Sequence, residues 1–263
     1  MPFGLTLSFI SNTLRSRIEM KNLLSVLIVM STVPTLFAQK EAQVHQSSVS
    51  RKYHQYREEI SEPSYHLATV KAMVKKIKED KEGNKPVSKK VFDAMSSAEK
   101  FTYTMIHGED ASQNCDAMPP ILSEETKIFG YFPSPFGDDV TWSERQRDYL
   151  AKNRSTVIPL IRSTMKLRQR AGVNLKGAIL HLNAVELIPD LVTTFNLKKK
   201  DFDILSLLMY LMKEGQYSEF MQSASYTKLY GEKSNYKGFL EGNVANQKLI
   251  IERAMAFYKT KIK

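Results

Sequence analysis

The segment richest in chemically reactive residue types is "HGEDASQNCDAMPP", residues 107–120. It holds His107, Glu109, Asp110 and Cys115, and Cys115 is the only cysteine of the chain. A cysteine paired with a histidine can act as a nucleophile, and a histidine with carboxylates can bind a divalent metal. One hypothesis is therefore a metal-dependent or Cys/His hydrolytic enzyme. The other is a polar turn, because a helix dipole favours a histidine in the last turn and nearby acids neutralise it.

Two further acids, Asp138 and Asp139, lie in "FGDD". On a folded loop they could join Glu109 and Asp110 to hold a divalent cation, so the candidate enzymatic site spans residues 107–139. The structural alternative is that paired acids in front of a helix stabilise its N-terminus. The sequence contains no H-E-x-x-H or C-x-x-C spacing, and we predict no cofactor from it.

A basic edge is predicted at Arg162, Lys166 and Arg170, whose spacing of four residues places them on one face of a helix. Such an edge could bind phosphate, sulfate or an anionic polymer. The alternative is an ordinary solvated face that keeps the protein soluble. No aromatic residue is interleaved with these cations for base stacking, which disfavours nucleic acid as the partner.

Tyrosine is concentrated in "KYHQY", residues 52–56, and in "SYTKLYGEKSNYKGF", residues 225–239. Both segments mix tyrosine with lysine and other polar residues, a composition that suits contact with a protein or a glycan. The alternative is that these tyrosines cover the rim of the core.

The elements that must position these residues are predicted to be helical. Hydrophobic residues make up 42% and charged residues 25% of the chain, and glycine and proline are sparse. We predict an all-α fold, an irregular bundle of about 7–9 helices with one long loop containing proline and glycine at about 108–141. The best strand candidate is the short "KIFGYF".

Apolar residues at helical spacing define the predicted elements. Gly108 is expected to end one helix in a left-handed conformation. Thr141 and Glu144 are expected to form a capping box for another. Pro159 is expected to kink or split that helix. The predicted helices cover residues 64–80, 88–107, 142–170, 174–195, 201–214, 217–231 and 244–262.

The amino terminus resembles a secretory signal in its parts. It has a probable true start at Met20, a basic Lys21, an apolar core from Leu23 to Met30 and a cleavage site near Ala38/Gln39. A retained anchor is the rival interpretation, but the apolar stretch falls short of the roughly 20 residues that a bilayer span needs. We therefore expect a signal region at 1–38, a flexible leader at 39–64 and a single helical domain at 65–263. The mature chain is expected in the periplasm or outside the cell, without a transmembrane span.

The net charge is +10, and removal of residues 1–38 lowers it only to +8. Most lysines alternate with acids, as on a solvated helical face. A single cysteine cannot form an intramolecular disulfide. The leading hypothesis is an exported, non-enzymatic helical domain that binds a protein or an anionic polymer. The competing hypothesis is the enzyme, with His107 as base or metal ligand.

Overall fold

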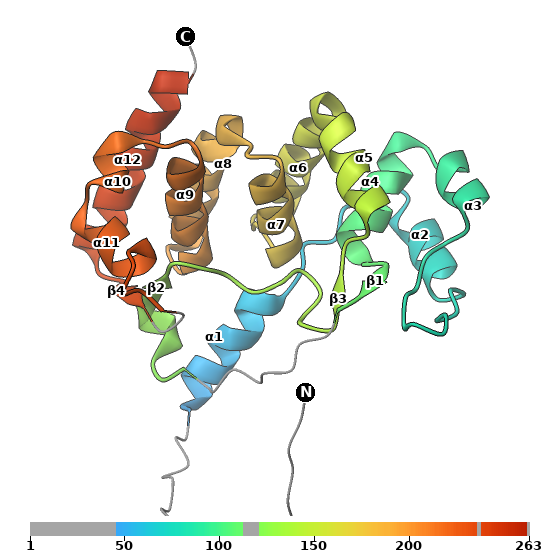
Figure 1. The fold of residues 1–263 in the computed structure, drawn as a ribbon, viewed down its shortest axis with the longest axis horizontal. Coiled ribbons are helices and arrows are strands. Elements are labelled where there is room, and N and C mark those ends of the chain that lie inside the picture. The colour runs from blue at the N-terminus through green and yellow to red at the C-terminus, as the bar shows by residue number, and fades with distance from the viewer. Residues whose placement is uncertain (1–45, 113–120, 236–237, 262–263) are drawn as a thin grey trace, which may run out of the picture. The chain divides into compact units, whose positions relative to one another are not determined.

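The computed structural model describes residues 46–112, 121–235 and 238–261 (Figure 1). All of them belong to one compact unit, which spans Val44–Lys263. The predicted signal region and Cys115 lie outside the described residues. No described helix is long and apolar enough to cross a membrane.

Helices dominate the described residues. The α-helices are α1 (Ser48–Glu58), α2 (Leu67–Val74), α3 (Lys89–Ala94), α4 (Ser97–Ile106), α5 (Glu144–Lys152), α6 (Arg154–Arg168), α7 (Val173–His181), α8 (Ile188–Lys198), α9 (Phe202–Glu214), α10 (Ser218–Met221), α11 (Ala224–Tyr230) and α12 (Val244–Lys261). Two 3-10 helices are η1 (Glu124–Thr126) and η2 (Val185–Leu187).

Two small antiparallel sheets correct the all-α prediction. Strand β1 (Asp110–Ala111) pairs with β3 (Val140–Thr141), and Asp110 lies opposite Thr141. Strand β2 (Lys127–Phe129) pairs with β4 (Phe239–Glu241), and Ile128 lies opposite Leu240. The candidate "KIFGYF" therefore does contain a strand. The predominantly helical character is confirmed, whereas the absence of sheets was a wrong prediction.

The described residues contain 12 α-helices rather than the predicted 7–9, because polar caps break the apolar stripes. The Ser96 capping box starts α4 and separates it from α3. Asn153 separates α5 from α6, while Pro159 lies inside α6 without ending it. One helix was predicted over 174–195, but α7 ends at His181, Asn183 takes a left-handed conformation, and η2 precedes α8, whose first turn contains Pro189.

Two predicted helix signals act differently from expectation. The capping box of α5 is formed by Ser143 and Gln146, because Thr141 belongs to strand β3. Gly108 is not in the left-handed region. Its role is close packing, since a Cβ at this position would lie 2.7 Å from Val140 and 2.8 Å from Phe136.

The core is centred on α9, which packs against α12, α8, α7 and β2 (Figure 1). Most of its side chains are buried, including Leu205, Leu208 and Met212. Helix α7 adds the buried side chains of Leu175 and Ile179 to this core. The surrounding helices bury one apolar face each, which is the usual basis of such a packing.

The segment expected to be a flexible leader contains helix α1, whose Ser50 and Arg57 are buried. This helix contacts η1. The folded unit thus begins earlier than residue 65. The described part of the predicted loop 108–141 carries β1, η1, β2 and β3, so short regular elements interrupt it.

The buried side chain of Asn174 in α7 joins the chain at Ser61 to the end of α4 at Met105. Its side chain is fully buried; Nδ2 donates to the carbonyl oxygens of Ser61 and Met105, and Oδ1 accepts from Ser61 N–H. We expect Asn174→Ala to lower the free energy of unfolding by about 2–4 kcal/mol, because several buried polar groups lose their partner. Chemical denaturation measures this loss. Asn196→Ala, on the exposed side of α8, is the control and should be nearly neutral; equal effects of both variants would contradict the assignment.

Candidate binding site

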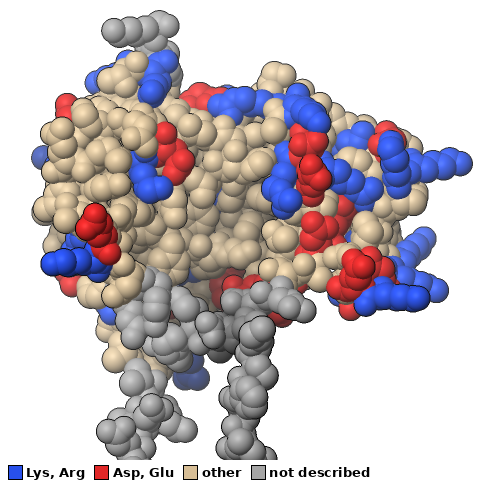
Figure 2. Space-filling model, in the orientation of Figure 1, with Lys and Arg blue, Asp and Glu red and all other residues tan. Residues whose placement is uncertain are grey.

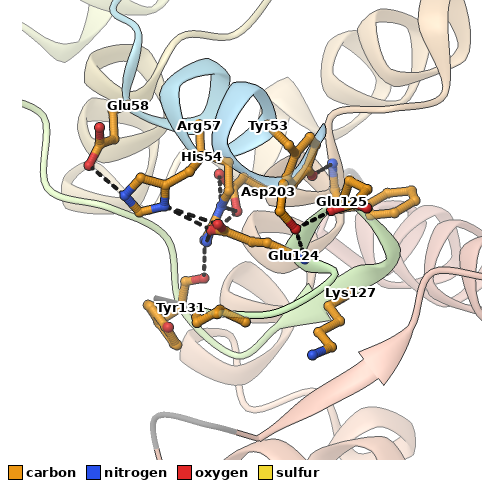
Figure 3. Close-up of polar contacts among 12 residues, drawn as sticks. Tyr53, His54, Arg57, Glu58, Glu124, Glu125, Lys127, Tyr131 and Asp203 are labelled. Carbon is orange, nitrogen blue, oxygen red and sulfur yellow. Dashed lines mark hydrogen bonds and ion pairs between the residues drawn. The ribbon is translucent and has the colours of Figure 1, made fainter. Parts of the chain in front are cut away.

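A buried arginine organises one end of the molecule. Arg57 on α1 is only 2% exposed, and Figure 3 shows it pointing toward Glu124 and Tyr131. Its Nη1 donates to Glu124, its Nε lies 3.0 Å from both carboxylate oxygens of Asp203, and its Nη2 lies 3.4 Å from the Tyr131 carbonyl. The guanidinium therefore connects α1, η1, α9 and the chain that follows β2.

The network continues into the core through Lys176 on α7, which is fully buried. Lys176 Nζ lies 2.6 Å from Asp201 Oδ1 and 3.9 Å from Asp203 Oδ2. Burial raises the pKa of Asp201, and Lys176 opposes this effect. With Glu124 included, three carboxyl groups lie against Arg57 and Lys176.

His54 can supply the third positive charge. Its Nδ1 lies 3.0 Å from Glu124 Oε2, and its Nε2 lies 3.2 Å from Glu58 Oε1 (Figure 3). The hydrogen bond with Glu124 raises the pKa of His54. Burial alone would raise the pKa of Glu124, but hydrogen bonds from His54 and Arg57 hold it below its usual value. When it is protonated, His54 adds a positive charge between Glu124 and Glu58.

Tyr131, whose backbone carbonyl accepts a hydrogen bond from Arg57, lines a pocket of about 250 Å³. The wall residues come from the end of β2, from α9, from α11 and from the chain before β4. They are Gly130, Tyr131, Tyr210, Leu229, Tyr230, Ser234, Asn235 and Gly238.

Aromatic rings form much of this wall. The rings of Tyr210 and Tyr230 lie 5.6 Å apart at 71°, and Tyr226 packs behind Tyr230 at 5.6 Å. Gly130 allows the wall to close, since a Cβ there would lie 3.3 Å from Tyr230 Cε1 and 3.2 Å from the Leu229 carbonyl. Near-perpendicular rings of this kind pack favourably and stay in place.

The hydroxyl of Tyr230 is buried and has no hydrogen-bond partner in the part of the chain that the structure describes. Burial, together with Tyr210 and Tyr226, raises the pKa of Tyr230, so the phenol stays protonated and can donate. Lys213 Nζ lies 5.4 Å from the centre of the Tyr210 ring and 5.9 Å from that of Tyr230, and it pairs with Glu214 at 2.9 Å.

The structure describes residues 107–112 of the predicted reactive segment. His107 follows α4, and its Nε2 lies 2.6 Å from the Lys85 carbonyl. Burial lowers the pKa of His107, which favours the neutral form, and its ring lies 5.1 Å from that of Tyr103. Asp110 lies in β1, paired through the backbone with Thr141.

Glu109 is 1% exposed and belongs to a second buried network. It accepts hydrogen bonds from Tyr103 at 2.6 Å, Ser143 at 2.6 Å and Arg145 at 2.7 Å. Burial alone would raise the pKa of Glu109, but these donors hold it below its usual value. Its carboxylate thus joins α4 to α5 rather than facing an open site.

Asp138 and Asp139 are exposed, and the Asp139 carbonyl accepts from Ser112 N–H at 2.8 Å. The carboxylate of Glu109 is paired with Arg145, so it is not available to bind a cation together with these two acids. No group of three His, Cys, Asp or Glu among the described residues could hold a metal ion.

The predicted basic edge is interrupted. Helix α6 ends at Arg168, and Gln169 takes a left-handed conformation that turns Arg170 away from the edge. Arg162 pairs with Asp190 at 2.9 Å, and Lys166 is exposed. Arg170 pairs with Glu59, and its guanidinium lies 4.0 Å from the centre of the Tyr56 ring.

Of the two tyrosine-rich segments, residues 225–239 do contribute to the pocket through Tyr230, Ser234 and Gly238. In residues 52–56, Tyr53 packs against the core, and the ring of Tyr56 stacks on the ring of Tyr53 with 6.2 Å between the ring centres. This arrangement fits the alternative that these tyrosines cover the rim of the core. The sequence analysis missed Arg57, Tyr131 and Tyr210. A buried arginine carries no periodic signal, and Tyr210 lies within an apolar helix.

The surface around these elements is uneven in charge. Figure 2 shows Lys, Arg, Asp and Glu gathered over α2–α5, whereas the surface over α7 is largely uncharged and a few charged side chains lie over α9.

Comparison with known proteins adds no function: no protein-family model, no curated protein and no solved structure matches this chain.

Loss of the central arginine should be costly. Arg57→Ala leaves Glu124 and Asp203 buried without their cation, and we expect a loss of about 3–5 kcal/mol in the free energy of unfolding. Lys89→Ala, which breaks the exposed pair with Asp93, is the control and should change this energy little. Denaturant titration compares the two variants. A loss below about 1 kcal/mol for Arg57→Ala would show that the network does not support the fold.

The raised pKa of His54 predicts a pH dependence of stability. A raised folded-state pKa stabilises the protein fully below the unfolded value of about 6.5, and this stabilisation disappears as the pH rises through the folded-state pKa. His54→Gln should therefore flatten the decrease in stability between about pH 6 and 8. Denaturation at several pH values measures the slope, and His181→Gln controls for replacement of an exposed histidine. Equal slopes for wild type and His54→Gln would refute the prediction.

Proposed function

We propose that this chain is an exported, non-enzymatic binding protein that recognises its partner through the tyrosine pocket. The observation that carries the proposal is the chemistry of the pocket wall. Its residues are tyrosine, glycine, leucine, serine and asparagine. Tyrosine gives a large rigid contact area, and serine, glycine and asparagine give adaptable hydrogen bonding, the composition typical of recognition surfaces.

The placement of the ionisable groups supports binding over the hydrolytic alternative. Catalysis by a general base needs a titratable side chain within reach of a bound substrate. Here the carboxylates of Glu109, Glu124 and Asp203 are buried and engaged by arginine. The described pocket wall contains no His, Cys, Asp, Glu, Lys or Arg.

The ion pairs of the basic residues favour a partner that is less charged than a polyanion. Of the three residues of the predicted basic edge, Arg162 and Arg170 are paired with acids. An ion pair weakens the attraction of either member for a further anion. We therefore place recognition at the pocket and assign the net positive charge a non-specific role.

Saturation-transfer NMR on the purified chain tests the proposal with three sets of probes: neutral oligosaccharides, tyrosine- and tryptophan-containing peptides, and heparin fragments. We expect at least one set to bind saturably and Tyr210→Leu to weaken that binding at least about tenfold. Tyr217→Leu, at a half-buried tyrosine that packs on Phe257 away from the pocket, is the control and should bind normally.

Two results would contradict this function. One is that no probe loses affinity in Tyr210→Leu. The other is hydrolysis of a p-nitrophenyl ester or phosphate that His107→Ala abolishes while the melting temperature stays the same. We expect His107→Ala to lower the melting temperature slightly and to change nothing else, because its ring contacts Tyr103 and the Lys85 carbonyl.

A further inference from the structure

We propose that the end of the molecule at which helices α6 and α8 terminate docks onto an anionic lipid surface. This inference goes beyond the tyrosine pocket and concerns a different set of residues, which we call the basic end. Its members are Lys166, Leu167, Arg168, Arg170, Leu197, Lys198, Lys199 and Lys200.

Helices α6 and α8 contact each other and run in the same direction. Arg154 starts α6 and pairs with Glu186, just before α8. Arg162, farther along α6, pairs with Asp190 in the first turn of α8. The C-terminal turns of the two helices therefore lie at the same end of the folded unit.

The chain leaves both helices in the same way and reaches the same aromatic ring. Gln169 after α6 and Lys199 after α8 both take left-handed conformations, with φ of 49°. The residues that follow them are Arg170 and Lys200. The Arg170 guanidinium lies 4.0 Å and the Lys200 ammonium 4.9 Å from the centre of the Tyr56 ring. The two exits are therefore neighbours in space.

Most cations of the basic end have no acidic partner. Within the described residues, an ion pair is absent from five exposed members: Lys166, Arg168, Lys198, Lys199 and Lys200. The acids that contact this end are engaged elsewhere, since Asp201 pairs with Lys176 and Glu59 pairs with Arg170. An excess of positive charge remains. Each lysine near an anionic bilayer strengthens binding about fivefold, and the attraction needs no particular headgroup.

Two exposed leucines favour a lipid surface over a soluble polyanion. Leu167, in the last turn of α6, is 59% exposed, and Leu197, in the last turn of α8, is 54% exposed. A cation, Arg168 or Lys198, directly follows each of them. Leucine gains little from a sulfated polysaccharide. At a membrane it can enter the boundary between headgroups and acyl chains while neighbouring lysines stay among the headgroups.

Cosedimentation with vesicles tests the inference. The chain from Gln39 onward is used, because it contains the whole compact unit and lacks the apolar segment Leu23–Met30, which would bind lipid by itself. Vesicles of phosphatidylcholine are compared with vesicles that also contain phosphatidylglycerol. We expect binding to the anionic vesicles alone, and we expect added salt to weaken it because salt screens exposed charges.

Matched lysine variants separate the basic end from net charge. The test variant changes three lysines of the basic end: Lys198→Gln, Lys199→Gln and Lys200→Gln. The control removes the same charge from three exposed lysines that follow α2: Lys75→Gln, Lys76→Gln and Lys78→Gln. We expect the test variant to bind anionic vesicles about a hundredfold more weakly and the control to bind nearly as tightly as wild type.

A matched pair of leucine variants tests the lipid contact. Leu197→Ser should weaken vesicle binding about fivefold, because an apolar side chain no longer enters the bilayer. Leu249→Ser, at a leucine of α12 that is 38% exposed, should have no effect. Tyr210→Leu alters the pocket and should bind vesicles normally, so the two surfaces are tested independently. Thermal melts confirm that each variant is folded.

The other outcomes overturn the inference. Equal losses in the two triple-lysine variants would show that net charge, and not the basic end, drives binding. Heparin binding that the test variant loses, without any vesicle binding, would replace the lipid surface by a sulfated polysaccharide. Equal affinities of Leu197→Ser and Leu249→Ser would remove the reason for choosing lipid.

Discussion

The pairing of Arg57 with Glu124 and Asp203 is the interaction on which this end of the molecule depends. Moving a charge out of water is costly, and the cost is offset only when partners of opposite charge and good hydrogen-bond geometry are present. Arg57 meets this condition with two carboxylates and a backbone carbonyl. Because these acceptors belong to η1, α9 and the chain after β2, the arginine sets the positions of all three relative to α1, and with them one wall of the pocket.

A second network obeys the same rule at the other end of the described unit. Glu109 receives hydrogen bonds from Tyr103, Ser143 and Arg145, and it joins α4 to the start of α5. Both networks use residue types that also serve in catalysis. In a low-dielectric interior their full pairing makes them rigid connections. Because these reactive groups are paired in the interior, the proposed binding surface is the tyrosine pocket, whose described wall consists of less reactive residues.

Three tyrosines of the pocket wall lie on or directly beside regular elements. Tyr210 lies on α9, the central helix, and Tyr230 lies at the end of α11. Tyr131 follows a strand and is held by Arg57. Sites on such supports are more precise than sites on free loops. A preorganised wall lowers the cost of ordering on binding, which matters most for a small ligand that can make few contacts.

Periodicity and composition are local properties, so they predict the helical class, several helices such as residues 201–214, a strand candidate in "KIFGYF" and the tyrosine-rich segment that reaches the pocket. Which charges meet depends on the packing of distant segments. Arg57 is 67 residues from Glu124 and 146 from Asp203, and no spacing rule connects them. The tertiary structure also turned Glu109 inward and Arg170 away from Arg162, since the fold pairs each charge with the partner that it brings nearest. Sequence patterns report which face of a helix is apolar, whereas the partner of a buried charge is fixed by long-range packing.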